Sequence, residues 1–134
     1  MEKISFKKFM PGIAWFFIIM VLTCLPGSDV PKIGWLDEIH FDKWVHIGMF
    51  ALLVFLFSYP FFKLHLSMAK RIRYFLWITI VASLWGLAIE FIQKYFVAGR
   101  SFDLLDWAAD SAGALVAFLY CRTRIGKSSS MVKV

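Results

Sequence analysis

The sequence predicts an all-α membrane protein with four transmembrane helices and with both termini on the cytoplasmic side. Three observations lead to this prediction: an apolar composition, four long apolar segments and an uneven distribution of basic residues. Of the 134 residues, 60% are hydrophobic, 19% aromatic and only 18% charged, whereas soluble proteins average about 45–50% apolar and about 25% charged residues. This composition excludes a disordered chain, and a soluble domain of this size has too little interior to bury so many apolar side chains.

Four segments are long and apolar enough to cross a bilayer, which requires about 20 mostly apolar residues. These predicted spans are Phe9–Leu25, Trp44–Phe62, Tyr74–Val97 and Leu104–Cys121. The first span follows several lysines, as in a signal peptide, but the residues after it form a poor cleavage site, so we predict that it is retained. The first two spans contain no acidic residue, whereas the third contains Glu90 and the fourth contains Asp106 and Asp110. The acids of the last two spans need an explanation beyond hydrophobicity.

The basic residues are concentrated on one side of the predicted spans. Eleven of the 15 lie before the first span, between the second and third, or after the fourth. Because lysine and arginine in short loops are enriched on the cytoplasmic side, both termini are predicted to be cytoplasmic. Eight of the nine acidic residues fall in the other half, so the two halves carry formal charges of +10 and −4. The net charge of +6 is thus explained by topology and by contact with anionic lipid, and no nucleic-acid partner is predicted.

The segments outside the spans are expected to be simple. We predict one membrane domain over residues 1–124 and a disordered cytoplasmic tail over residues 125–134. The longest connection, from Pro26 to Phe41, contains Trp35 beside aliphatic residues. This segment is either a plain connecting loop or a segment that lies on the membrane interface.

The polar residues of the last three spans fall on one face of each helix. Their spacings of three or four residues are those of a single helix face. The three faces are Asp42, His46 and Phe50; Gly86, Glu90, Gln93 and Val97; and Asp103, Asp106, Asp110, Gly113 and Ala117. Given the predicted orientation, all three faces lie at the same depth, in the outer leaflet.

Burial at this depth requires partners for the acidic side chains. Glu90 lies roughly 10 Å from the end of its predicted helix, at 1.5 Å per residue. An unpaired acid at mid-membrane costs roughly 2.5–3.5 kcal/mol or more, so we expect Glu90 and Asp110 to be paired. The candidate partners are His46, Lys43, Arg100 and Gln93. A polar network that only fixes the order of the helices is the alternative function for Glu90, His46 and Asp106.

Simpler roles are open for some of the other residues. Ser101 could be the N-cap of the fourth helix, which would place Asp103 in its first turn, where an acid favours the helix dipole. Gly48, Gly86 and Gly113 could allow close packing between helices.

Four stretches that cover most of the chain carry these residues in a fixed order. They are Leu25-Pro26-Gly27, Asp42-Lys43-Trp44-Val45-His46, Glu90-Phe91-Ile92-Gln93, and Gly99-Arg100-Ser101 followed by Asp106, Asp110 and Gly113. Together they resemble the VanZ-like family of small bacterial membrane proteins. The resemblance implies that the signature positions are Asp42, Lys43, His46, Glu90, Gln93, Arg100, Ser101 and Asp106.

The sequence departs from the family pattern at three positions. Ile47 stands where the family often has Phe, Phe50 where it often has Tyr, and Asp110 where it often has Asn. The last difference adds an ionisable group to the polar faces. The family is named for a member linked to low-level resistance to teicoplanin, a lipoglycopeptide that acts outside the membrane. The resemblance therefore implies a role in the bacterial inner membrane, close to cell-envelope material.

Two functions are open on this basis. In the first, the site binds or modulates a membrane lipid or a lipid-linked envelope precursor, with Arg100 and Lys43 at phosphate and the acids at amine or hydroxyl groups. In the second, the protein is an intramembrane hydrolase or transferase that acts on an amphiphile. The candidate catalytic residues are His46, Glu90 and Asp106, and the candidate ligand-binding residues are Asp42, Lys43, Gln93, Arg100, Ser101 and Asp110. The spacing matches no metal motif, so no metal and no cofactor is predicted.

Overall fold

The computed structural model describes residues 4–26, 28, 34 and 40–130, with side chains described as far as residue 125. The chain is helical along most of this part. In order, the elements are η1 (Phe6–Phe9), α1 (Met10–Thr23), α3 (Phe41–Ser58), η3 (Tyr59–Lys63), α4 (Met68–Phe96) and α5 (Leu104–Ser130). These described residues contain no strand, which confirms the all-α prediction.

Four helical stretches are long and apolar enough to span a membrane. They are Phe6–Thr23, Phe41–Lys63, Met68–Phe96 and Leu104–Ile125. The prediction of a multi-pass membrane protein with four transmembrane helices is therefore confirmed. Many large apolar side chains remain exposed along these helices, among them Phe17, Trp77, Val81 and Leu84. Such a surface would be a liability in water, whereas it matches the hydrocarbon of a bilayer.

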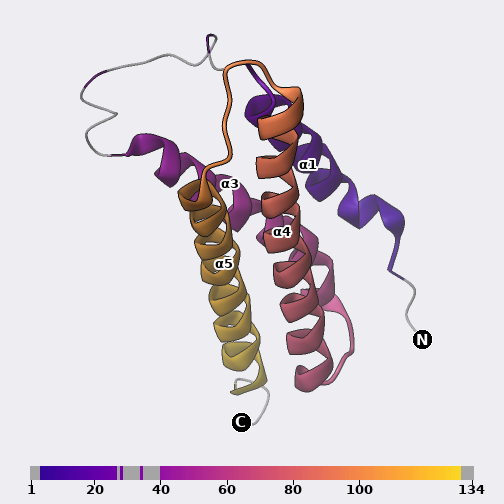
Figure 1. Ribbon diagram of the computed structural model, residues 1–134. Helices are drawn as coiled ribbons and strands as arrows, with labels where there is room; N and C mark the ends of the chain where they lie inside the picture. Colours follow the sequence, from indigo (N-terminus) through magenta and orange to yellow (C-terminus); the bar gives the residue numbers. More distant parts are fainter. Residues whose placement is uncertain (1–3, 27, 29–33, 35–39, 131–134) are drawn as a thin grey trace.

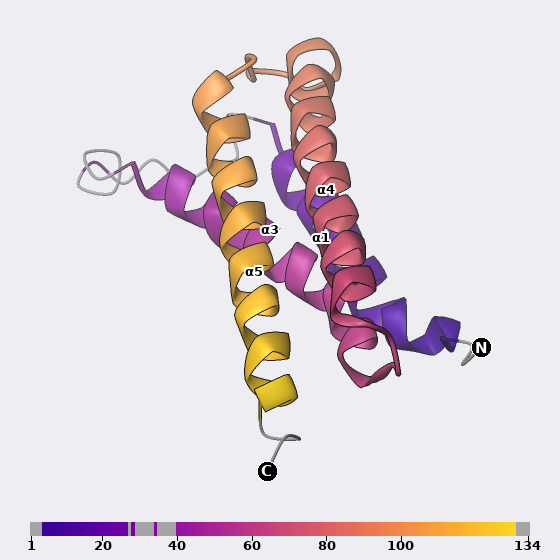
Figure 2. The same cartoon turned by 90° about the horizontal axis from the view of Figure 1, so that it is seen from below.

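The helices form one bundle (Figure 1). α4 and α5 run side by side, and α3 crosses α5 obliquely, as the second view shows (Figure 2). α3 and α5 share the most extensive contact, while α1 packs against α3 and α4. The α4–α5 connection lies at one end of the bundle. α5 ends at the opposite end, and the start of α1 lies nearer to that opposite end.

Of the three glycines for which a packing role was expected, two lie where helices approach each other closely. A Cβ at Gly113 of α5 would collide with the backbone carbonyl of Ile47 in α3. A Cβ at Gly86 of α4 would lie 2.7 Å from Asp110 Oδ2 of α5. By contrast, nothing lies within 4 Å of a Cβ at Gly48. The packing role is therefore confirmed for Gly86 and Gly113 and is wrong for Gly48, which faces open space.

The centre of the bundle is an apolar core to which all four spans contribute. Ile19, Phe50, Val54, Ile89 and Ala114 are each at most 1% exposed. Phe50 lies one turn after His46 on the same helix face, and Ala114 lies one turn after Asp110. The apolar core thus begins where the polar faces end, and its packing fixes the rotation of each helix.

Both ends of α5 differ from their sequence-based expectation. Asp103 precedes the helix, and its Oδ1 accepts a hydrogen bond from the Leu105 N–H at 2.8 Å. The expectation that Ser101 is the N-cap is therefore wrong, because α5 begins only at Leu104 and Asp103 takes the capping position. Residues 125–130, which the sequence placed in a disordered tail, continue α5, since extending a formed helix costs little. Residues 131–134 and most of the connection that contains Trp35 lie outside the described residues.

Candidate functional site

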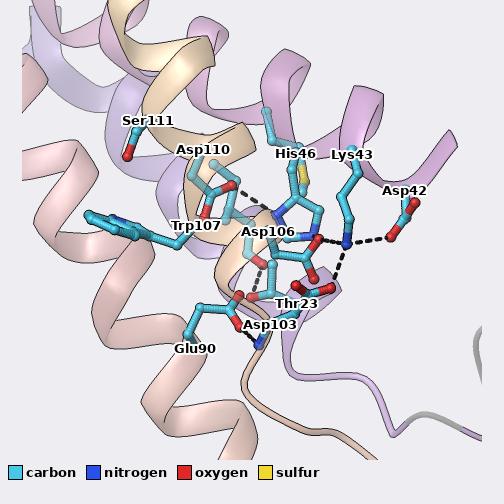
Figure 3. Close-up of polar contacts among 12 residues, drawn as sticks. Thr23, Asp42, Lys43, His46, Glu90, Asp103, Asp106, Trp107, Asp110 and Ser111 are labelled. Carbon is cyan, nitrogen blue, oxygen red and sulfur yellow. Dashed lines mark hydrogen bonds and ion pairs between the residues drawn. The ribbon is translucent and has the colours of Figure 1, made fainter. Parts of the chain in front are cut away.

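Ionisable side chains gather where α3, α4 and the start of α5 meet, near the end of the bundle that holds the α4–α5 connection (Figure 3). We call this group the polar cluster. It consists of Asp42, Lys43, His46, Glu90, Asp103, Asp106 and Asp110. The predicted convergence of three polar helix faces is thereby observed.

Lys43, in the first turn of α3, joins three carboxylates. Its Nζ lies 2.9 Å from Asp42 Oδ2 and 2.7 Å from Asp103 Oδ2, and it also forms an ion pair with Asp106 Oδ1. The Lys43 side chain is 19% exposed and that of Asp106 only 10%, so solvent and salt screen this pair less than the pair with the exposed Asp42. Lys43 thus holds the start of α3 against the start of α5.

His46 lies one turn deeper on α3 and pairs with Asp110. The His46 Nδ1 is 2.8 Å from Asp110 Oδ1, while its Nε2 is 3.9 Å from Asp106 Oδ1. Asp110 is fully buried and His46 is 8% exposed. The imidazole therefore lies between two carboxylates of α5 that are one helical turn apart, which fixes the orientation of its ring (Figure 3).

Glu90 connects α4 to the same group through the backbone. Its Oε2 accepts a hydrogen bond of 2.8 Å from the Asp103 N–H, and the residue is fully buried. Asp103 therefore links Glu90 to Lys43. Asp103 lies just outside the membrane-spanning part of α5, where the hydrogen bond from the Lys43 ammonium lowers the pKa of its carboxyl below the usual value.

The remaining predicted site residues lie around this cluster rather than in it. Gln93 is buried, and its Nε2 donates to the backbone carbonyl of Thr23 at 2.8 Å, which ties α4 to the end of α1. The Arg100 Nε donates to the Leu25 carbonyl at 3.3 Å. Ser101 is exposed and has no hydrogen bond among the described residues. Arg100 is thus not the partner of Glu90 or Asp110 that the sequence suggested.

Further contacts hold α4 and α5 together beside Asp110. The Trp107 Nε1 donates to the Ser83 carbonyl at 3.0 Å, and the hydroxyls of Ser83 and Ser111 are 2.7 Å apart. Gly86 of α4 packs directly against the Asp110 carboxylate. The helix pair that presents Asp106 and Asp110 to His46 is therefore fixed by polar contacts as well as by the apolar core.

The sequence also matches a protein-family model. The model, described as VanZ/LLP1, matches residues 8–125. The chain belongs to the VanZ/LLP1 family. The family resemblance that the sequence predicted is therefore confirmed. No match was found among the curated proteins, and none among the solved structures.

The part of the chain that matches VanZ/LLP1 includes the whole polar cluster. The polar cluster contains more acidic than basic side chains. Five carboxyl groups share two basic side chains, Lys43 and His46. Glu90 Oε1 and Asp110 Oδ2 are buried and have no hydrogen-bond partner among the described residues. No three His, Cys, Asp or Glu side chains in the described part of the chain are placed to hold a metal ion. A proton, a buried water or a donor group of a ligand would each satisfy these oxygens.

Asp103 is the member of the cluster that the sequence-based set of site residues did not include. Its side chain contacts Lys43, and its backbone N–H contacts Glu90. The sequence does indicate that Asp103 belongs to the cluster, because it lies three residues before Asp106 on the same predicted helix face. A simpler role in the first helical turn, where an acid favours the helix dipole, accounts equally well for Asp103 in the sequence alone. The backbone carbonyl of Thr23, which accepts from Gln93, had no such signal.

Proposed function

We propose that this VanZ/LLP1 protein binds the headgroup of an amphiphile at the polar cluster. The amphiphile is a membrane lipid or a lipid-linked precursor of the cell envelope. The observation that carries the proposal is the buried Glu90 oxygen without a partner, beside more carboxyl groups than basic ones. An unsatisfied buried acceptor costs about 1–3 kcal/mol, so an amine or hydroxyl group of a ligand that donates to it would be bound favourably.

The charge distribution supports a particular orientation of the headgroup. Lys43 is already surrounded by three carboxylates, so a phosphate beside it would meet more negative than positive charge. The terminal nitrogens of Arg100 have no partner among the described residues. We therefore place phosphate at Arg100, near Ser101, and amine or hydroxyl groups at the carboxylates, since guanidinium suits bidentate phosphate contacts.

We further propose that the protein lies in the bacterial inner membrane, with both termini in the cytoplasm and the polar cluster in the outer half. The distribution of basic residues supports this orientation. A lipid-linked precursor bound there would be close to the place where teicoplanin acts. This proximity supports a role in glycopeptide resistance as one use of the binding site.

Photo-crosslinking in living cells tests the binding proposal. A photoreactive amino acid replaces Val45, which is next to His46, and in a matched protein it replaces Leu52, deeper on α3; both positions are 39% exposed. We expect one defined lipid species in the Val45 adducts and the bulk lipid mixture in the Leu52 adducts. Asp106→Asn should reduce the yield of the defined species. The same mixture at both positions would contradict the proposal.

A second candidate function is an intramembrane hydrolase or transferase. The observation in its favour is the His46–Asp110 pair, in which a buried carboxylate orients Nδ1 and leaves Nε2 directed towards Asp106. An imidazole held in this way is suited to general acid–base catalysis, with Asp106 or Glu90 as a second proton carrier.

A comparison of two proteins separates the candidates. Membrane lipids from cells that produce the wild type or the His46→Gln variant are analysed by mass spectrometry. An enzyme should give a product lipid with the wild type alone, while crosslinking at Val45 persists in the variant. If no lipid changes in abundance and the variant loses the crosslink, the binding function is favoured.

A further inference from the structure

An apolar cavity of about 320 Å³ opens between α1, α3 and α4, away from the polar cluster. We call it the α1–α3–α4 groove. Its lining consists mostly of bulky side chains, namely Phe16 of α1, Leu53 and Phe57 of α3, and Trp77 and Trp85 of α4, together with the small side chain of Ala82. The volume is within the range of about 300–1,000 Å³ that is typical of small-molecule sites. Because Trp77 is 59% exposed, the groove is open to the surrounding lipid.

The groove continues the helix faces that carry the polar cluster. On α4, Ala82, Gly86 and Glu90 follow one another at intervals of four residues, which is one helix face. On α3, Leu53 lies seven residues after His46, about 10 Å deeper in the membrane. The groove therefore lies below the polar cluster by about the distance that separates a headgroup from the middle of a lipid chain.

The shape of the groove favours a flexible chain over another helix. Helices associate in membranes through small residues that allow their backbones to approach closely. Here Ala82 is the one small side chain among the described lining residues, and four of the others are aromatic. A neighbouring helix would rest on these rings and leave the groove empty, whereas a hydrocarbon chain can bend between them and fill it.

We propose that the α1–α3–α4 groove binds one hydrocarbon chain of the same amphiphile whose headgroup lies at the polar cluster. The inference rests on the proposed binding function and specifies its ligand as a molecule with a long acyl or isoprenoid chain. Headgroup and chain are then recognised at two separate places. The polar cluster selects the ligand by its headgroup. The groove binds one hydrocarbon chain and slows its exchange with the lipids of the bilayer.

A pair of matched variants tests the groove. Val81 lines the groove and is 61% exposed, whereas Leu84, on another face of the same helix, is 59% exposed and does not line it. Val81→Trp and Leu84→Trp add similar bulk at positions where folding tolerates it. The full-length proteins are reconstituted in vesicles of equal parts phosphatidylethanolamine and phosphatidylglycerol and then extracted into dodecyl maltoside. Native mass spectrometry counts and identifies the retained lipids.

We expect the wild type and Leu84→Trp to retain one lipid per chain and Val81→Trp to retain at least fivefold less. Equal retention by Val81→Trp, loss by both variants, a wild type that retains no lipid, or a second protein copy in place of lipid would each overturn the groove proposal. The headgroup is scored separately. If the wild type enriches one of the two lipids but Val81→Trp retains it fully, the groove fails and the binding function stands. If Val81→Trp loses lipid but the retained headgroups mirror the vesicle, the groove stands and the headgroup site fails.

Discussion

Lys43 is surrounded by more carboxylates than one ammonium can neutralise. Its Nζ contacts Asp42, Asp103 and Asp106, and the Asp106 side chain is only 10% exposed. Removing one partner of a buried ion pair costs about 3–5 kcal/mol, because the other charge is left without compensation. Since the Lys43 side chain keeps 19% exposure, we expect Lys43→Met to lower the free energy of unfolding by about 3 kcal/mol, measured by denaturant titration in detergent micelles.

A double variant identifies the cause of that loss. Asp106→Asn removes the charge that Lys43→Met leaves unpaired, so the two substitutions together should cost less than the sum of their separate effects. Lys43→Arg, which keeps the charge, should recover part of the stability. Strictly additive losses would show that Lys43 acts through packing of its alkyl chain instead.

Asp103 makes the stability of the cluster depend on pH. The hydrogen bond from Lys43 lowers the folded-state pKa of Asp103 below its usual value. Its stabilising effect is therefore present above the unfolded-state pKa of about 3.9 and is lost as the pH falls through the lower, folded-state pKa. We expect the wild type to be more stable than Asp103→Asn at pH 7, and the gap between their midpoints of thermal unfolding to narrow towards pH 3. A gap that does not change with pH would mean that the charge of the Asp103 carboxylate is not what stabilises the protein.

At the scale of the helices, Gly113 sets how closely α3 and α5 can cross. A Cβ there would overlap the Ile47 carbonyl, which belongs to the backbone and cannot rotate away. Gly113→Ala should therefore force the two helices apart and destabilise the protein by about 1–3 kcal/mol, as overpacking does. It should also weaken the His46–Asp110 contact, which spans the same crossing. Thermal unfolding measures the loss of stability. A lower yield of the defined lipid adduct at Val45 would report the disturbed His46–Asp110 contact.

Gly48 is the matched control for this substitution. It lies next to Ile47 on α3, and nothing is within 4 Å of a Cβ placed on it. Gly48→Ala should leave stability unchanged or raise it slightly, because alanine favours a helix more than glycine does. Equal losses at Gly48 and Gly113 would mean that backbone freedom, and not the helix crossing, is what the glycines provide.

The helices also show how far sequence reasoning reaches. Spacing of three and four residues predicted the polar faces and their common depth, because period and length follow from helix geometry alone. It could not predict the pairs, since small rotations of α3 and α5 decide whether Lys43 meets Asp103 or Glu90. The expectation that Arg100 pairs with a buried acid was wrong for a related reason. Arg100 lies in the α4–α5 connection, where helix periodicity gives no guidance, and its Nε donates to the Leu25 carbonyl.

At the scale of the whole molecule, the two ends of the bundle differ in charge. The carboxylates and their two bases gather near the α4–α5 connection, while the lower half of the bundle contains the apolar groove and the basic flanks of the spans. A membrane protein needs few polar residues to fold, and buried acids reduce its stability unless they are paired. An acid-rich cluster near one end of the bundle, with an apolar groove deeper along the same helices, is consistent with the proposed binding of an amphiphile.

This arrangement gives a function outside the cell only if the cluster faces outward, and the orientation can be measured. Ala69 lies at the basic start of α4 and Ser101 in the α4–α5 connection; both are small and exposed. In a protein without its native cysteines, a membrane-impermeant thiol reagent should label Ser101→Cys on intact spheroplasts. Ala69→Cys should react only after the membrane is disrupted, because the basic flanks favour the cytoplasm. The opposite pattern would place the carboxylates at the cytoplasmic face and would rule out contact with extracellular envelope precursors.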